Sequence, residues 1–217
     1  MIGEVLKGFA TTEMGWGFMW VLLLFFIVMV AVAIERAYYI MVRSNINAPR
    51  FMSEIRKLVK AGDYKKALSL CSSARNKALA QVVAAGLKKV SESETIDFRS
   101  IQNSVDEGTL EVIPKLQDRT SYLAMIANIA TLTGLMGTIY GLIGAFRAVS
   151  APGIDATEKS RMLASGIAVA MNTTLVGLAI AIPAILIYTY LQSKTVKIID
   201  EIDEHTVKLI NLITGNQ

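Results

Sequence analysis

Five threonines lie toward the middle of long apolar stretches that carry no charged residue, and their hydroxyls are the groups of this chain best suited to line a path for ions. They are Thr131, Thr133, Thr138, Thr173 and Thr174. Thr131 and Thr138 are seven residues apart and therefore share one face of a helix. A polar stripe at membrane depth is typical of a lined pathway. A threonine can equally return its hydroxyl to the carbonyl three or four residues earlier, so the purely structural interpretation stays open.

Side chains of Asp, Glu, Lys, Arg and His are absent from the three charge-free stretches, which are residues 14–34, 120–146 and 162–193. A proton relay needs a group that changes its protonation state, which threonine does not do near neutral pH. If ions cross the membrane here, another protein must supply the carboxylate. The chain has one cysteine, Cys71, and one histidine, His205, which exclude an intrachain disulfide and a multi-histidine metal site. We therefore expect no resident metal or cofactor and no enzymatic activity.

Small residues recur every three or four positions in the second and third stretches. Gly134, Gly137 and Gly141 fall on one helix face of the second, and Gly177 falls on a similar face of the third. Small residues at this period let membrane helices approach closely. The pattern predicts helix packing through these faces, and we assign Pro183 to the same packing set.

Each charge-free stretch is long enough to cross a bilayer as a helix, because about 20 residues at a rise of about 1.5 Å span the hydrocarbon core. Tryptophan and tyrosine residues flank the stretch 14–34 at both ends, as in the interfacial belts of spanning helices. Ala31-Val32-Ala33 resembles a signal-peptidase site. The segment before this stretch is not positive and the stretch is longer than a usual signal core, so we favour an uncleaved transmembrane helix.

Basic residues near the membrane ends are distributed unequally, with eight on the side of segments 35–119 and 194–217 and four on the other side. The positive-inside rule therefore predicts a three-span topology. Residues 1–13 form an external N-terminus, 14–34, 120–146 and 162–193 form the spans, and 147–161 forms an external loop. Residues 35–119 form a cytoplasmic helical loop, and 194–217 form a cytoplasmic tail that continues the third helix. The membrane topology accounts for the excess of basic residues, so we expect no nucleic-acid binding.

The segment 35–119 shows helical periodicity and no strand-like alternation, so we expect an all-α integral membrane protein with long helical extensions into the cytoplasm. Asp63 is placed to cap the N-terminus of a helix from Tyr64 to Cys71, and Cys71 is expected in a core. The helical pattern from Thr95 runs through Pro114 straight into the second span. His205, beside Asp203 and Glu204, is expected on a solvated face.

Several motifs carry a resemblance to a known family. They are Ile34-Glu35-Arg36, the run Gly62 to Leu68, the run Gly134-Leu-Met-Gly-Thr138-Ile-Tyr-Gly141, the run Gly166 to Leu178, and Ala181-Ile-Pro-Ala184. With these motifs in this order the chain resembles the ExbB/TolQ/MotA family of motor stators, closest to its three-span ExbB and TolQ branch. Family members often have Glu where Val169 stands and Pro where Thr131 stands.

The resemblance implies a homopentamer in the bacterial inner membrane, with a periplasmic N-terminus and a cytoplasmic C-terminus. It implies an ExbD/TolR-like single-span partner whose intramembrane Asp carries the ion, and a TonB/TolA-like envelope-spanning protein as a further partner. Ion flow, driven by the proton motive force, would do mechanical work on the envelope for energised transport or maintenance. Thr138 and Thr174 match the pore-lining hydroxyls, and the extra hydroxyls of Thr131, Thr133 and Thr173 could serve Na⁺ in place of H⁺.

Two hypotheses of different kinds follow from the sequence. In the first, the chain is a subunit of an ion-driven stator. In the second, it is an ion-independent structural membrane scaffold whose small-residue faces only assemble helices. The sequence alone leaves both open, because hydroxyls and glycines serve either purpose.

Overall fold

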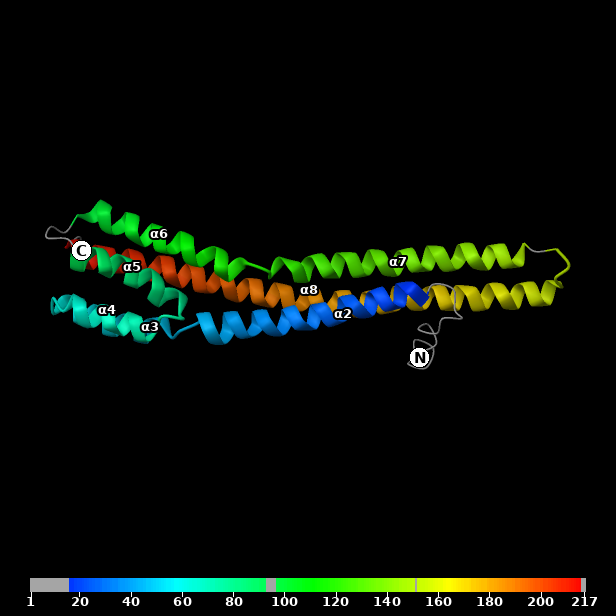
Figure 1. Cartoon of the computed structure of the whole chain (residues 1–217), viewed down its shortest axis with the longest axis horizontal. Helices are drawn as coiled ribbons and strands as arrows, with labels where there is room; N and C mark the ends of the chain where they lie inside the picture. The colour runs from blue at the N-terminus through cyan, green and yellow to red at the C-terminus, as the bar shows by residue number, and fades with distance from the viewer. Residues whose placement is uncertain (1–15, 93–96, 151, 216–217) are drawn as a thin grey trace. The chain divides into compact units, whose positions relative to one another are not determined.

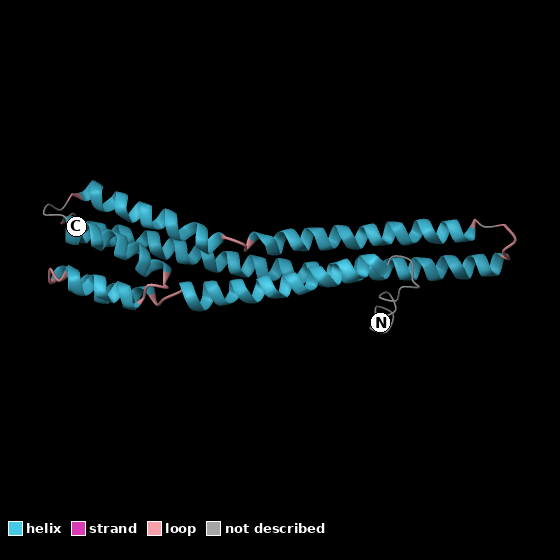
Figure 2. Cartoon of the chain, viewed as in Figure 1, coloured by secondary structure: helices cyan, strands magenta, loops and turns pink. Residues whose placement is uncertain are grey.

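The computed structural model describes residues 16–92, 97–150 and 152–215. These residues form helices and connecting turns without any strand, which confirms the all-α fold class (Figure 2). In chain order the helices are α2 (Trp16–Ala37), the π-helical η1 (Tyr38–Ser44), α3 (Ala48–Lys60), α4 (Tyr64–Ser73), α5 (Ala78–Glu92), α6 (Phe98–Gln117), α7 (Ser121–Val149) and α8 (Ala156–Thr214). The segment 1–13, predicted to be external, lies outside the described residues.

The chain divides into two compact units. Unit 1 comprises the described part of Met1–Ile34 together with Arg119–Thr189, and unit 2 comprises Glu35–Asp118 and Tyr190–Gln217 within the same limits. Three helical stretches, which contain α2, α7 and α8, are long and apolar enough to cross a membrane. The protein is therefore a multi-pass membrane protein.

In unit 1, α7 and the first part of α8 run side by side, connected by a short loop (Figure 1). Their contact is close because backbone meets backbone. A methyl group added to Gly134 would lie 2.9 Å from the carbonyl oxygen of Thr173, and one added to Gly177 would lie 2.7 Å from that of Ala130. At Gly141 an added methyl would lie 2.8 Å from the Cβ of Ala170. The small residues at these positions are thus what allows the two helices to approach.

Helix α2 completes unit 1 by packing against both of the other helices. The ring of Phe18 lies 5.7 Å from that of Tyr140 on α7, in a tilted arrangement. On the side of α8, Leu23 and Phe26 line a groove together with Val176. The apolar side chains that α2 exposes elsewhere, such as Leu24 and Ile27, match a surface that lipid covers.

In unit 2, short amphipathic helices follow one another from α3 to α6. Asp63 accepts a hydrogen bond from the backbone N–H of Lys66 at 3.1 Å, so it caps α4 as predicted. Cys71 is buried, and burial raises the pKa of its thiol to about 12. Helices α5 and α6 pack closely, since a methyl added to Gly86 would lie 2.7 Å from a methyl of Val105.

The predicted continuous helix from Thr95 into the second span is wrong. Helix α6 ends at Gln117, α7 begins at Ser121, and Arg119 between them has a positive φ of 57°. That conformation interrupts a right-handed helix, because L-residues other than glycine rarely adopt it. By contrast, α8 continues without a break from its membrane part into the tail, in spite of Pro183.

Arg36, at the end of α2, is almost completely buried within unit 2. Its guanidinium forms an ion pair of 2.9 Å with Glu35. It also donates to the backbone carbonyl of Lys115 on α6 at 3.4 Å and lies over the ring of Tyr39. These contacts hold α2 to α6 where the chain enters unit 2.

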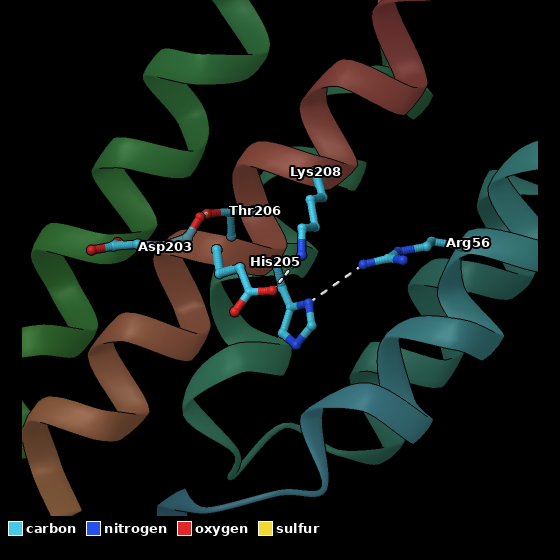
Figure 3. A network of polar contacts seen from close by, with 6 residues as sticks. Arg56, Asp203, His205, Thr206 and Lys208 are labelled. Atoms are coloured by element: carbon cyan, nitrogen blue, oxygen red, sulfur yellow. Dashed lines mark hydrogen bonds and ion pairs between the residues drawn. The ribbon is translucent and has the colours of Figure 1, made fainter. Parts of the chain in front are cut away.

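The prediction of a solvated His205 is wrong, because only 8% of the residue is exposed. It faces α3, and its Nδ1 lies 3.5 Å from Nη2 of Arg56 (Figure 3). A guanidinium can only donate, so the ring is neutral, with Nδ1 as acceptor. Burial lowers the pKa of His205, Arg56 and Lys208 lower it further, and Glu204 and Glu201 oppose them.

This arrangement predicts that acid destabilises unit 2. The pKa of His205 is lower in the folded chain than its ordinary value of 6.5, so the unfolded chain binds the proton more readily. The stabilisation is therefore complete above about pH 6.5 and declines as the pH falls toward the folded pKa. Denaturant melts of the whole chain between pH 5 and 8 should show this slope, and His205→Gln should flatten it. An identical slope in the variant would show that other groups cause the pH dependence.

The α7–α8 contact predicts a strong difference between two glycine-to-alanine substitutions. In Gly177→Ala the new methyl meets the backbone of α7, so the helices must separate, and we expect a loss of about 1–3 kcal/mol in stability. Gly17→Ala on α2 is the matched control, since no atom lies within 4 Å of the added methyl. Unfolding in mixed micelles measures both variants. Equal stability of the two would contradict the observed contact.

Candidate functional site

Three of the predicted threonines meet at one place between α7 and α8, around the backbone carbonyl of Gly134. The hydroxyls of Thr138, Thr173 and Thr174 lie 3.3, 3.1 and 3.0 Å from this oxygen. Thr138 and Thr173 also reach the carbonyl of Ala170, at 3.1 and 2.8 Å. The hydroxyls of Thr138 and Thr174 contact each other. We call these three hydroxyls and two carbonyls the hydroxyl cluster.

The hydroxyl cluster has more hydrogen-bonding capacity than its own members use. Each carbonyl has two lone pairs, of which the helix N–H four residues later occupies one. Two of the three hydroxyl protons can therefore satisfy Gly134 and Ala170, and the third can go to a neighbouring hydroxyl. The hydroxyl oxygens keep free lone pairs, and each hydroxyl can rotate between a carbonyl and an incoming group. The cluster can thus donate to an anion or offer oxygens to a cation.

One edge of the hydroxyl cluster is accessible. Thr173 is only 3% exposed and points into the helix contact, whereas Thr138 and Thr174 are half-buried. A group from outside the chain would therefore meet Thr138 and Thr174 first. Thr173 lies behind them and holds the two carbonyls.

The glycines explain why the hydroxyls can meet. A methyl on Gly137 would lie 2.7 Å from the hydroxyl oxygen of Thr173, and a methyl on Gly134 would lie 3.1 Å from Cα of Thr174. With larger residues at these two positions, α8 could not bring its threonines to the α7 backbone. Close packing and the hydroxyl cluster are therefore one feature of the sequence.

The structure does not bring the other predicted site residues into the hydroxyl cluster. The hydroxyl of Thr131 donates to the carbonyl of Ala127 in its own helix, at 3.0 Å. Thr133 is buried without being a member of the cluster. Pro183, which we assigned to helix packing, is exposed in the single chain. For Thr131 the structure thus shows the back-bonded arrangement of an ordinary helical threonine.

A cavity of about 490 Å³ lies between α7 and α8 on the loop side of the hydroxyl cluster. Gly141 and Gly166 form part of its wall, with Ser165 and Arg161 as its polar members. Val169 also lines it. Gly141 borders Ala170, whose carbonyl belongs to the cluster, so the cavity adjoins the cluster directly. Arg161 forms an ion pair with Glu158 at 2.8 Å.

Two participants of the site were not predicted from the sequence, namely the carbonyls of Gly134 and Ala170. Every residue has a carbonyl, so only the small residues opposite the threonines could have indicated which ones become accessible. A metal site of the usual kind is not apparent in residues 16–92, 97–150 and 152–215, where no three His, Cys, Asp or Glu side chains gather. The oxygens of the hydroxyl cluster suit a hard cation such as Na⁺.

Comparison with known proteins assigns the chain to a family. Residues 74–204 match the model of the MotA/TolQ/ExbB proton channel family. A putative biopolymer transport protein ExbB homolog of Methanothermobacter thermautotrophicus is 28% identical over 186 residues, which cover 84% of this chain and 60% of that protein. The Tol-Pal system protein TolQ of Haemophilus influenzae is 39% identical over 80 residues, or 36% of this chain and 33% of TolQ. The chain thus spans less than two thirds of these relatives.

A solved structure agrees with the assignment. The structure of C. jejuni MotAB matches with a TM-score of 0.64 and 15% sequence identity, over 100% of this chain and 76% of the MotAB chain. At this identity the match concerns the fold alone. The family model covers more than half of the chain, and its matched residues include every member of the hydroxyl cluster. The chain is a member of the MotA/TolQ/ExbB proton channel family.

Proposed function

We propose that this chain is the multi-span subunit of an ion-driven motor in the bacterial inner membrane, which converts ion flow into mechanical work on the cell envelope. The observation that carries the proposal is the hydroxyl cluster, with its accessible edge at Thr138 and Thr174. Family membership supports ion conduction. The relatives named for biopolymer transport and for the Tol-Pal system support envelope work of one of those kinds.

A partner must supply the titratable group, because the three spans contain no Asp, Glu, Lys, Arg or His. A single-span protein of the ExbD or TolR kind, with an intramembrane Asp, has the required chemistry. Its carboxylate would be stabilised by hydroxyl donors when ionised, and those hydroxyls would turn back to the Gly134 and Ala170 carbonyls when it is protonated. A homopentamer around the partner would present the accessible edge of each subunit inward. The chain itself then performs no enzymatic reaction.

The transported ion is H⁺ in this proposal, and the cavity beside Val169 would be its approach to the hydroxyl cluster. Since Val169 cannot titrate, the partner's carboxylate would act without a second carboxylate from this chain. Na⁺ is the alternative ion, supported by the five oxygens of the cluster. A TonB- or TolA-like protein would then transmit the work across the envelope.

A structural scaffold is the second candidate, and one observation favours it. The three hydroxyls of the cluster already have acceptors within the chain, as expected if they only join α7 to α8. The half-buried positions of Thr138 and Thr174 favour the motor, because helix packing alone does not require an accessible edge.

The orientation in the membrane predicts a labelling pattern. Ala156→Cys lies beside Asp155 in the proposed external loop, and Lys88→Cys lies on α5 in the proposed cytoplasmic unit. The native Cys71 is buried and its thiol stays protonated, so it should not react. An impermeant maleimide added to intact spheroplasts should label Ala156→Cys and spare Lys88→Cys. Labelling of both from one side would contradict the three-span topology.

Replacing the hydroxyls tests the function. Thr138→Val and Thr174→Val keep the shape of the side chain but remove a donor to the passing charge, which is worth about 1.5–3 kcal/mol. Ion flux through the reconstituted complex should therefore fall by about one to two orders of magnitude. Thr189→Val is the control, since this hydroxyl donates to the carbonyl of Ile185 in its own helix. If the complexes assemble and both cluster variants conduct like the parent, the hydroxyl cluster is not part of the ion pathway.

A further inference from the structure

Leu110 on α6 is an apolar side chain that is exposed outside the membrane spans. It is 75% exposed, the largest exposed fraction among the large hydrophobic residues of the described part of the chain. Exposed leucines of α2, α7 and α8 lie in membrane spans, where lipid covers them. Leu110 belongs to unit 2, outside the spans, so lipid does not shield it from water and another protein surface would have to bury it.

Acidic side chains surround Leu110. Asp106 and Glu107 precede it by one turn, Glu111 follows it, and all three are exposed. The segment 103–114 contains no basic residue. Glu111 is paired with Lys115 at 2.7 Å, which leaves Asp106 and Glu107 as the stronger negative part of this face. We call Asp106, Glu107, Leu110 and Glu111 the α6 face.

A groove of complementary character lies on α3 and α4. It has a volume of about 550 Å³, with Leu58 and Leu70 as its apolar floor. Lys57 and Lys66 stand at its edges, together with Glu54. Lys66 is bound to Asp63 at 2.6 Å, whereas Lys57 extends into solvent on an exposed helix position. We call this feature the α3–α4 groove.

The α6 face and the helices that carry the α3–α4 groove differ in charge. Residues 48–77, which include α3 and α4, contain eight Lys or Arg against two Asp or Glu. Of the two lysines that line the groove, Lys57 is the one not paired with Asp63, so it is the cation available to the acidic α6 face, while Leu110 matches the apolar floor. Within one chain α5 packs against both α4 and α6, so the groove and the α6 face lie on different helix pairs.

We propose that the α6 face of one copy of this chain docks in the α3–α4 groove of the next copy, with Leu110 between Leu58 and Leu70. Because the contact joins two unlike surfaces, each copy offers one of each, and repetition closes a ring if the rotation permits. The contact presupposes the homo-oligomer of the proposed function and gives it a second site of subunit recognition, outside the membrane. The charged residues at this contact would determine how neighbouring copies align with each other more than they would strengthen the binding between them.

Cross-linking between distinguishable chains tests the contact. Chains lacking Cys71, through Cys71→Ala, would carry either Ser69→Cys in the groove or Asn103→Cys on α6, one turn before the α6 face, each with its own tag. A short bis-maleimide added to the mixed oligomer should join Ser69→Cys to Asn103→Cys, and neither variant to itself. Lys88→Cys on α5, whose side chain is 66% exposed, is the matched control and should give no comparable product. Since each chain has one cysteine, every product joins two chains.

Charge reversal gives an independent measurement. Lys57→Glu and Glu107→Lys should each lower the yield of the cross-link by about two- to fivefold, as expected for exposed pairs. The double variant should recover most of it, because the charges are exchanged and not removed. Unchanged yields in both single variants would overturn the pairing.

Native mass spectrometry of the same samples separates this inference from the proposed function. If the oligomer forms and the expected cross-link is absent, or if Asn103→Cys joins itself equally well, the docking contact is wrong and the motor proposal stands. If no oligomer forms at all, both are wrong. Protection of Ser69→Cys only by vesicles containing anionic lipid would assign the groove to the membrane surface and overturn the contact between copies.

Discussion

The close approach of α7 and α8 is the constraint on which the rest of the structure depends. The backbones meet at Gly134 and Gly177, where even a methyl group would collide with a carbonyl oxygen. Membrane helices gain little from burying apolar surface against each other, so packing and hydrogen bonds must hold them together. The same approach brings three threonine hydroxyls to one carbonyl, so the feature that stabilises the helix pair also creates its polar site.

The absence of charge from the spans determines what this polar site can do. Hydroxyls and carbonyls can stabilise a charge or an ion, but they cannot carry a proton through a change of protonation state near neutral pH. In the proposed function, the hydroxyls and carbonyls of this chain surround the path of the ion, and a partner protein supplies the titrating group. This division explains how the spans can be fully apolar apart from hydroxyls and amides in a member of a proton channel family.

Local patterns made much of the structure predictable. The all-α fold, the Asp63 cap and the small-residue faces follow from features within a few residues of each other. The break before α7 was missed because neither Asp118 nor Arg119 is a glycine, the residue that usually marks a left-handed position. His205 was misplaced because its acidic neighbours suggested solvent, although Ile202 and Leu209 place it on the buried face. The threonines of the hydroxyl cluster were predicted from the sequence, but its two carbonyls were not. Which carbonyls the hydroxyls reach depends on how α7 and α8 pack against each other.

Ion flux through purified protein in proteoliposomes tests most directly whether a partner supplies the titrating group, because this chain and the partner can be reconstituted separately or together. We predict that the chain alone conducts no more than empty liposomes under a pH gradient. Addition of the single-span partner should start the flux, and a partner with Asn in place of its intramembrane Asp should not. Conduction by the chain alone at the rate of the complex would show that no carboxylate from a partner is needed and would contradict the proposed function.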